Sequence, residues 1–230
     1  MNDDLRARLA DVDARISDAA RSAGRDPSGI TRIVVTKFHP AALVRELHGL
    51  GVRDVGENRQ QELTAKVAEL SDLSDLRWHF VGQAQTNKAR AIRAAASTVH
   101  SVDRSRLADA LDAAGEPGGD MLDVLVQVNL TDDPGRGGTA PGEVAALAEH
   151  IAASCPTLRL RGVMGVAPLD EPAASAFARL AEAGARVRTI VPDAEWISAG
   201  MTGDFAEAIA AGATHLRIGS AITGPRPVHG

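Results

Sequence analysis

A lysine stands directly after the most strand-like stretch in the first part of the sequence. Residues 30–36 (Ile-Thr-Arg-Ile-Val-Val-Thr) are β-branched and apolar, which predicts a buried strand. Lys37 follows this stretch, and Pro40 then opens the next helix. A primary amine at the end of a buried strand could form a Schiff base with an aldehyde or pair with a phosphate. It could equally extend its ammonium into solvent along an apolar stem, and this stretch alone leaves these alternatives open.

Two glycine turns near the C-terminal end of the chain have the residue types of an anion site. Residues 198–202 (Ser-Ala-Gly-Met-Thr) lead from one predicted strand into a helix, and residues 217–220 (Arg-Ile-Gly-Ser) close the last predicted strand. Glycine turns and helix N-termini present backbone N–H groups to an anion. Either turn alone could be an ordinary connection between a strand and a helix. Together, in the last two strand–helix units, they predict a phosphate site.

Other polar residues give weaker signals. Glu57 and Asn58 could orient a ligand, although capping the next helix is the simpler role for the glutamate. His79 and His100 lie within predicted strands, and we interpret them as core or rim histidines whose hydrogen bonds are satisfied. No spacing of His, Cys and Asp indicates a metal site, and the sequence contains no P-loop or Gly-x-Ser-x-Gly motif.

The scaffold for these residues is an alternation of strands and helices along the whole chain. Strands are predicted at residues 30–36, 52–55, 77–81, 98–102, 122–129, 158–164, 195–198 and 214–218. Helices are predicted at residues 2–24, 40–50, 57–70, 84–96, 104–114, 141–154, 171–190 and 203–211. Eight strands in 230 residues predict a single-domain (β/α)8 TIM barrel over residues 1–230, with an extra N-terminal helix. A doubly wound open sheet is the second choice.

Composition narrows the classes of partner. The net charge of −5 and the lack of basic runs argue against nucleic acid or an anionic membrane as the main partner. One cysteine, Cys155, leaves no internal disulfide and suits a reducing compartment. No signal peptide and no apolar run of membrane-spanning length is present, so we expect a cytoplasmic protein. The sequence also contains no tyrosine.

Several short segments resemble one known family. They are residues 35–37 (Val-Thr-Lys), 56–58 (Gly-Glu-Asn), 78–82 (Trp-His-Phe-Val-Gly), 87–88 (Asn-Lys), 101–103 (Ser-Val-Asp), 198–204 (Ser-Ala-Gly-Met-Thr-Gly-Asp) and 217–222 (Arg-Ile-Gly-Ser-Ala-Ile). Taken in this order, they look like the motifs of the pyridoxal phosphate homeostasis proteins, the single-domain relatives of alanine racemase. The resemblance runs from about residue 5 to residue 224. It implies a fold-type III barrel that binds pyridoxal 5'-phosphate (PLP).

The resemblance also implies roles for individual residues. Lys37 would hold PLP as an internal aldimine, and Arg217 would face the pyridine nitrogen. Ser198, Gly219 and Ser220 would hold the phosphate. The full set of implied cofactor-binding residues is Lys37, Asn58, Ser198, Gly200, Met201, Arg217, Gly219 and Ser220. Phe38, Ala199 and residues 223–225 (Thr-Gly-Pro) depart from the residues common in the family, and these departures bear on the shape of the pocket near the cofactor.

Three functions compete for a lysine at the rim of a barrel. The first is a non-catalytic PLP carrier that serves intracellular PLP homeostasis, and the second is a PLP-dependent amino-acid racemase of low activity. The racemases that the family resembles use a tyrosine from an additional domain as second base, and a chain without tyrosine favours the carrier. A third function, Schiff-base chemistry of Lys37 on a phosphorylated sugar, predicts acid–base pairs on the rim that we do not identify. For the carrier we expect a monomer, with apo forms of PLP-dependent enzymes as possible partners.

Overall fold

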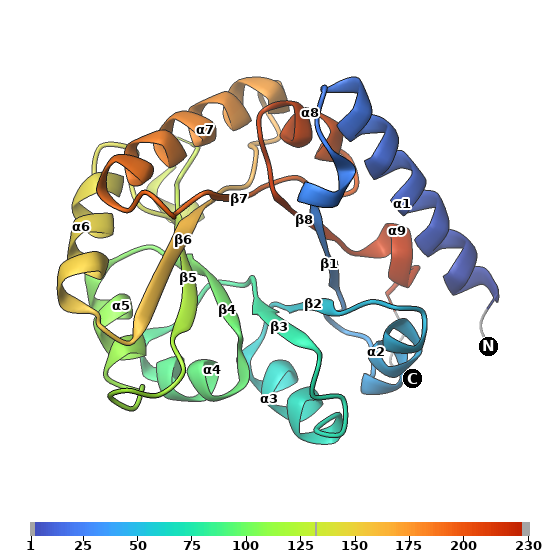
Figure 1. Ribbon diagram of the computed structural model, residues 1–230, viewed down its shortest axis with the longest axis horizontal. Helices are drawn as coiled ribbons and strands as arrows, with labels where there is room; N and C mark the ends of the chain where they lie inside the picture. The colour runs from blue at the N-terminus through green and yellow to red at the C-terminus, as the bar shows by residue number, and fades with distance from the viewer. Residues whose placement is uncertain (1–2, 132, 227–230) are drawn as a thin grey trace.

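The computed structural model describes residues 3–131 and 133–226, and its centre is a closed barrel of eight parallel strands (Figure 1). Each strand pairs with the next along the chain, and β8 pairs with β1. The strands are β1 (Thr31–Val35), β2 (Asp54–Glu57), β3 (Arg77–Phe80), β4 (Thr98–Val102), β5 (Leu122–Gln127), β6 (Leu158–Met164), β7 (Trp196–Ser198) and β8 (His215–Ile218). The expected (β/α)8 barrel is confirmed, and the open doubly wound sheet is wrong because the sheet closes on itself.

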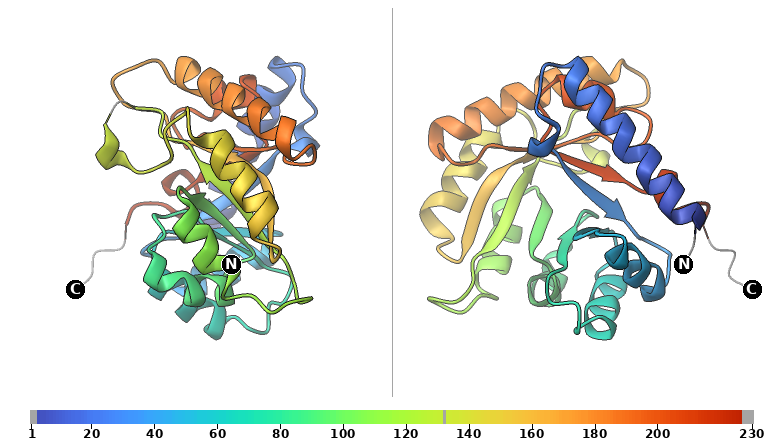
Figure 2. Two further views of the ribbon diagram at one scale, coloured as in Figure 1. Left: turned by 90° about the vertical axis from the view of Figure 1, so that its left-hand side faces the viewer. Right: turned by 45° about the vertical axis from the view of Figure 1, so that its right-hand side comes forward.

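Helices surround the barrel on its outside, as the three ribbon views show (Figure 1, Figure 2). They are α1 (Asp3–Ser22), α2 (Ala41–Gly49), α3 (Gln60–Glu69), α4 (Ala89–Ala95), α5 (Ser105–Asp112), α6 (Val144–Ser154), α7 (Ala173–Ile190), α8 (Phe205–Ala210) and α9 (Ser220–Thr223). Three short 3₁₀ turns, Pro27–Gly29, Thr86–Lys88 and Pro134–Arg136, precede β1, α4 and α6. Each strand is therefore followed by a helix, which brings the C-terminal ends of all strands to one rim.

Alternation along the strands separates the core into an outer layer and a barrel interior. Val34, Trp78 and Phe80 are buried in one apolar cluster with residues of the surrounding helices. Ile33 and Leu125 are fully buried but lie outside that cluster. Because successive side chains of a strand point to opposite faces, these residues project into the barrel. Nearly all of the buried apolar residues belong to the outer cluster, and the interior can hold polar side chains.

The N-terminal helix α1 precedes the first strand and packs beside the last two helices, α8 and α9. Its buried face carries Leu5, Leu9, Val12, Ile16 and Ala20 at helical spacing, as the amphipathic pattern predicts. The Arg8 guanidinium donates to the Ile222 carbonyl over 2.8 Å and so joins α1 to α9. The extra helix is confirmed, and its expected first residue, residue 2, lies outside the described residues.

Two local differences from the expected elements lie near the carboxyl-end rim. The second strand begins at Asp54 and runs to Glu57, two residues later than expected, because Val52 is still part of the turn that leaves α2. The Val52 N–H donates to the Leu47 carbonyl over 3.0 Å, across Gly51 with a φ of 93°. The short helix α9 after β8 was not expected. Both differences change which residues stand at the rim.

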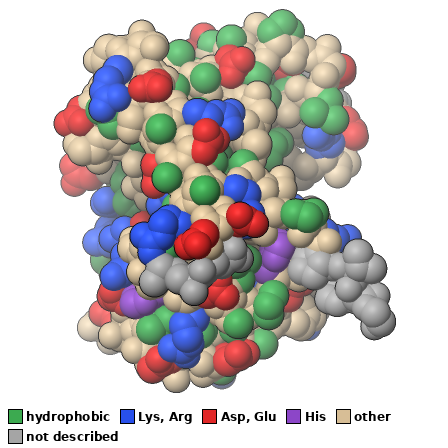
Figure 3. Space-filling model, turned by 90° about the vertical axis from the view of Figure 1, so that its right-hand side faces the viewer, with side chains coloured by type: hydrophobic (Ala, Val, Ile, Leu, Met, Phe, Trp, Pro, Cys, Tyr) green, Lys and Arg blue, Asp and Glu red, His purple; other side chains and the backbone are tan. Residues whose placement is uncertain are grey.

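On the face that Figure 3 shows, acidic and basic side chains are interspersed, and neither sign of charge dominates. This distribution agrees with the low net charge of −5. Among the described helices, none is long and apolar enough to cross a membrane.

Candidate functional site

A cavity of about 420 Å³ opens at the rim formed by the C-terminal ends of the strands. Its lining comes from the segments that follow β1, β2, β3, β6, β7 and β8. The lining residues are Val35, Lys37, Asn58, Val81, Val166, Met201, Thr202, Gly203, Arg217, Gly219 and Ser220. Its volume suits a small cofactor, and its position is that of active sites in barrels of this type.

Lys37 lies in a tight turn between β1 and α2, and its side chain is exposed at the cavity. Phe38, the next residue, has a φ of 69°, a left-handed conformation that is uncommon for an aromatic residue. Its N–H donates to Oε2 of Glu62 over 2.9 Å. The Lys66 ammonium donates to the Thr36 carbonyl over 2.8 Å. The backbone is therefore fixed on both sides of Lys37.

Glu57 is the buried group that completes this support. Its Oε1 accepts from the Thr36 hydroxyl over 2.6 Å and from the Lys66 ammonium over 2.5 Å. Burial raises the pKa of the Glu57 carboxyl, and Lys66 opposes that shift. The expectation that Glu57 caps a helix is wrong, because β2 continues through this residue and α3 begins only at Gln60. Its role in the structure is to hold the turn that carries Lys37.

The chain contains three lysines, and only one of them lines the cavity. Lys66 is buried and its ammonium is taken by Glu57 and by the Thr36 carbonyl. Lys88 ends the 3₁₀ turn before α4 and is absent from the lining. A Schiff base formed by a lysine in this cavity therefore requires Lys37.

Arg217 forms the floor of the cavity and is only 6% exposed. One terminal nitrogen donates to the Ser198 hydroxyl over 2.7 Å, and the other donates to the Gly165 carbonyl over 2.9 Å. Burial lowers the pKa of the guanidinium to about 10, which leaves it protonated at neutral pH. The cavity thus has a fixed cation at its base and a lysine at its side.

The turn after β7 forms one wall of the cavity. Gly200 has a φ of 89°, and a Cβ there would lie 2.7 Å from Cβ of Ala208, so only glycine permits this close approach. The Met201 N–H donates to Oδ1 of Asp204 over 2.6 Å, which closes the loop on itself. Thr202 and the following glycine lie on the cavity wall, just before the start of α8. The loop therefore presents backbone to the cavity.

The segment after β8 forms the opposite wall. Gly219 precedes α9, and Ser220 is its first residue. A Cβ on Gly219 would meet no atom closer than 3.7 Å, so the backbone is open toward its surroundings at this point. The first backbone N–H groups of a helix have no acceptor within the helix. The two walls together offer short polar backbone segments near two cations, a donor set that suits a phosphate.

One lining residue, Asn58, has a buried polar atom without a hydrogen-bond partner in the part of the chain that the structure describes. Oδ1 of the Asn58 side chain is buried and has no hydrogen-bond partner among the described residues. Buried polar atoms in native proteins are almost always paired, so this amide is suited to contact a ligand. An aldehyde that also carries a phosphate fits the groups present: an amine at Lys37, a cation at Arg217, an unpaired amide and the two backbone walls.

Six of the eight residues proposed from the sequence line the cavity: Lys37, Asn58, Met201, Arg217, Gly219 and Ser220. The other two, Ser198 and Gly200, lie outside the lining. Ser198 is fully buried beneath the cavity, where its hydroxyl contacts Arg217 and His100. The set of cofactor-binding residues expected from the sequence did not include five further lining residues, Val35, Val81, Val166, Thr202 and Gly203. Apolar residues and turn residues carry little chemical signal of their own.

The two histidines expected in the core, His79 and His100, are buried and hydrogen-bonded, as predicted. Nδ1 of His79 lies 2.9 Å from Nε2 of His100.

A separate group of side chains lies close enough together to bind a cation, and the sequence spacing did not reveal it. It consists of Asp109, His150 and Cys155. Burial raises the pKa of the Cys155 thiol to about 11, so it is not a thiolate at neutral pH, and His150 already contacts Asp109 over 2.6 Å.

Sequence comparison identifies relatives over nearly the whole chain. Residues 10–227 match the family model of the alanine racemase N-terminal domain. The pyridoxal phosphate homeostasis protein of Pseudomonas aeruginosa is 44% identical over 222 residues, covering 95% of this chain and 94% of that protein. The protein of the same name from Mycobacterium tuberculosis is 42% identical over 241 residues, covering 97% and 93%.

Solved structures give the same relationship. PipY of Synechococcus elongatus with PLP bound is 35% identical, with a TM-score of 0.83 over 96% of this chain and 100% of that one. The form without PLP has a TM-score of 0.84. Alanine racemase of Corynebacterium glutamicum is 14% identical and has a TM-score of 0.71 over 99% of this chain and 62% of its own, a likeness of fold.

Proposed function

The chain belongs to the family of the alanine racemase N-terminal domain and the pyridoxal phosphate homeostasis proteins, and on this premise we propose that it binds PLP in the cavity at the barrel rim. The observation that carries the proposal is the pairing of groups in that cavity. Lys37 is the one lysine in the lining, and Arg217 is a buried cation at its floor. PLP needs an amine for its aldehyde, and the Arg217 guanidinium offers a fixed hydrogen-bond donor to its ring.

In this proposal each part of the cavity has a distinct task. Lys37 would hold PLP by its aldehyde, because its amine is the one in the lining that can combine reversibly with an aldehyde. Gly219, Ser220 and the loop before α8 hold the phosphate through backbone N–H groups and a hydroxyl. Asn58, whose Oδ1 has no partner among the described residues, and Met201 would hold the ring from the cavity lining. Arg217 would hold the pyridine nitrogen.

The protein carries PLP and does not turn over amino acids at ordinary enzymatic rates in this proposal. PLP withdraws electrons best when its pyridine nitrogen is protonated, which an acidic partner promotes. Arg217 donates and cannot accept, so it keeps the nitrogen unprotonated and weakens this effect. A racemase needs a second base as well, and the chain has no tyrosine to supply one. Exchange of the cofactor requires only the lysine amine and the aldehyde.

The setting of this function follows from the same proposal. The protein serves PLP homeostasis in the cytoplasm as a single domain and a monomer, and it holds the cofactor until an apo form of a PLP-dependent enzyme takes it. The Schiff base is reversible, so transfer to a competing lysine or amine needs no other reactant.

Absorption spectroscopy tests PLP binding, and turnover assays separate the carrier from the racemase. Protein incubated with PLP and then dialysed should keep a band near ~420 nm, as PLP Schiff bases do. Pyridoxal, which lacks the phosphate, should bind about 100-fold more weakly or worse, because charge-assisted contacts are lost. Racemisation of any amino acid at about 1 per second or faster would replace the carrier with the racemase.

A further inference from the structure

The barrel interior below the cavity is polar, although such interiors are usually filled by Val, Ile and Leu. His79, His100 and Ser198 stand there on β3, β4 and β7, and none of them is more than 2% exposed. Trp78 and Phe80 beside His79, Val99 before His100, and Ile197 before Ser198 are apolar and belong to the outer cluster. The polar residues therefore occupy positions that alternation assigns to the barrel interior.

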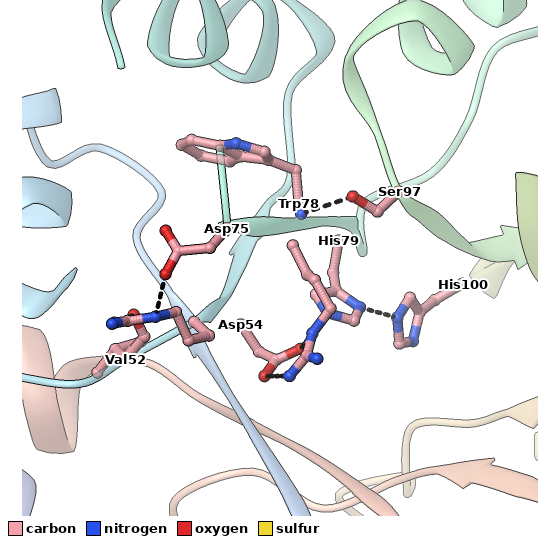
Figure 4. A network of polar contacts seen from close by, with 9 residues as sticks. Val52, Asp54, Asp75, Trp78, His79, Ser97 and His100 are labelled. Atoms are coloured by element: carbon pink, nitrogen blue, oxygen red, sulfur yellow. Dashed lines mark hydrogen bonds and ion pairs between the residues drawn. The ribbon is translucent and has the colours of Figure 1, made fainter. Parts of the chain in front are cut away.

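These residues join Arg217 to the opposite end of the barrel through consecutive contacts. Arg217 donates to the Ser198 hydroxyl over 2.7 Å, and that hydroxyl lies 2.8 Å from Nδ1 of His100. Nε2 of His100 lies 2.9 Å from Nδ1 of His79. Nε2 of His79 lies 3.0 Å from Oδ1 of Asp54, the first residue of β2. Figure 4 shows the part of this series that runs from His100 through His79 to Asp54.

The Asp54 end fixes the direction of these hydrogen bonds when each ring carries one proton. An ionised carboxylate only accepts, so His79 donates to Asp54 from Nε2, and Nδ1 of His79 then accepts from Nε2 of His100. Nδ1 of His100 in turn accepts from the Ser198 hydroxyl, whose lone pairs accept from Arg217. In this arrangement both rings are neutral imidazoles with the proton on Nε2.

The surroundings favour a neutral His100 ring. His79, Arg217 and His215 are the charged or titratable groups that face His100, and each of them, like burial itself, lowers its pKa. Asp54 stays ionised because it accepts from Nε and a terminal nitrogen of Arg77, the residue paired with it on β3. The hydrogen bonds to Arg77 and His79 lower the pKa of the Asp54 carboxyl against the effect of burial. A cation and an anion thus stand at opposite ends of one neutral series.

We infer that Ser198, His100, His79 and Asp54 form one directed hydrogen-bond chain that positions Arg217 under the cavity and couples its guanidinium to a carboxylate at the far end of the barrel. These four are positioning residues, because only Arg217 lines the cavity. The chain fixes the rotation of the guanidinium and polarises it through aligned donors. Its effect on a bound cofactor rests on the proposed function, whereas the existence and direction of the chain do not.

Nitrogen NMR of the histidine rings in the cofactor-free protein tests the chain itself. His79 and His100 should both appear as neutral Nε2–H tautomers at pH 8, with the nonprotonated Nδ1 signals shifted by hydrogen bonding. Ser198→Ala should move the Nδ1 signal of His100 and leave its Nε2–H tautomer in place, because Nδ1 of His79 still accepts from it. An Nδ1–H tautomer or a charged ring at either residue in the wild-type protein overturns the direction we infer.

A matched pair of variants tests the coupling to the cofactor. Asp54→Asn keeps an acceptor for His79 but removes the charge, and Asp123→Asn makes the same change in the equivalent pair between β5 and β6, where Asp123 contacts Arg159 over 2.5 Å and no histidine. Asp54→Asn should weaken PLP binding about tenfold and shift the absorption band, while Asp123→Asn should match wild type. Equal effects of the two variants overturn the coupling. A wild-type protein that shows the inferred tautomers yet binds no PLP overturns the proposed function and leaves the chain intact.

Discussion

The Arg217 guanidinium donates to the Ser198 hydroxyl over 2.7 Å, which places Ser198 beneath the cavity. The sequence resemblance implied that this serine holds the phosphate. In the structure its hydroxyl is occupied by Arg217 on one side and His100 on the other. The contact instead orients the cation that faces the cavity, so the properties of Arg217 depend on the barrel interior.

Replacement of Arg217 should change the chemistry of bound PLP more than its retention. Arg217→Glu puts an acid where the guanidinium was, and an acid can share a proton with the pyridine nitrogen and strengthen its electron withdrawal. We expect a shifted absorption band and slow side reactions with amino acids that the wild-type protein lacks. Arg217→Gln removes the charge without supplying an acid, so this variant should not show the side reactions with amino acids. Product analysis after incubation with alanine checks this, and identical behaviour of the two variants would contradict the role of Arg217.

A side chain at residue 219 should fill the cavity without disturbing the fold. A Cβ at Gly219 would lie 3.7 Å from its nearest neighbour, and the φ of this residue is not in the left-handed region. We expect Gly219→Val to reduce PLP affinity by about tenfold or more, because overpacking commonly costs about 1–3 kcal/mol. Gly49→Ala, on the outer helix α2 where a Cβ meets nothing within 4 Å, is the control. Unchanged affinity in Gly219→Val would move the phosphate away from this wall.

The buried pair of Glu57 and Lys66 should dominate the stability of the lysine turn. Lys66→Met leaves the Glu57 carboxylate buried and unpaired, which typically costs about 3–5 kcal/mol. The double variant with Glu57→Gln should recover most of that loss. Urea unfolding at neutral pH measures both. Arg45→Ala, which breaks an exposed pair with Asp72, should leave the free energy of unfolding almost unchanged. Equal losses in Lys66→Met and Arg45→Ala would contradict this account.

The strands, most helices and the lysine were predictable because their signals are local. A run of β-branched residues marks β1, and leucines that alternate with arginines mark the first half of β6. A lysine directly after the first of these strands is visible without any knowledge of the fold. The role of Glu57 was missed because it depends on a two-residue shift of β2, and strand ends are the least certain part of such predictions. The partners of Glu57 come from β1 and α3, which the sequence alone cannot bring together.

The hydrogen-bond chain was not predictable for a related reason. His100 and Ser198 are 98 residues apart in sequence, and their contact exists only because β4 and β7 face each other across the barrel. A histidine between apolar strand residues looks the same whether it is an isolated core residue or part of a series. The alternation that places Trp78 and Phe80 outward places His79 inward, so the interior position of His79 could be predicted. Its hydrogen-bond partners could not, because they lie on other strands.

Acid should destabilise the protein through its buried neutral histidines. Burial lowers the pKa of His215 to about 3 from an ordinary value of 6.5, and the pKa of His100 is also lowered well below that value. Between about pH 3 and pH 6.5 the unfolded chain binds a proton at His215 that the folded chain does not bind. The free energy of unfolding should therefore fall as pH decreases below about 6.5, by about 1.4 kcal/mol per pH unit for each histidine. Urea unfolding at pH 7, 6 and 5 measures the slope, and His215→Phe should reduce it; the same slope in that variant would assign the effect elsewhere.

The site of covalent attachment tests the central claim most directly. Borohydride reduces a PLP Schiff base to a stable secondary amine, and the chain offers three lysines at which mass spectrometry can locate it. Reduction of the PLP-loaded protein should place the modification on Lys37, and Lys37→Ala should fold normally and carry none. Modification of Lys88 or Lys66 in the wild-type protein, or undiminished labelling of Lys37→Ala, would contradict the assignment of Lys37 as the residue that carries PLP.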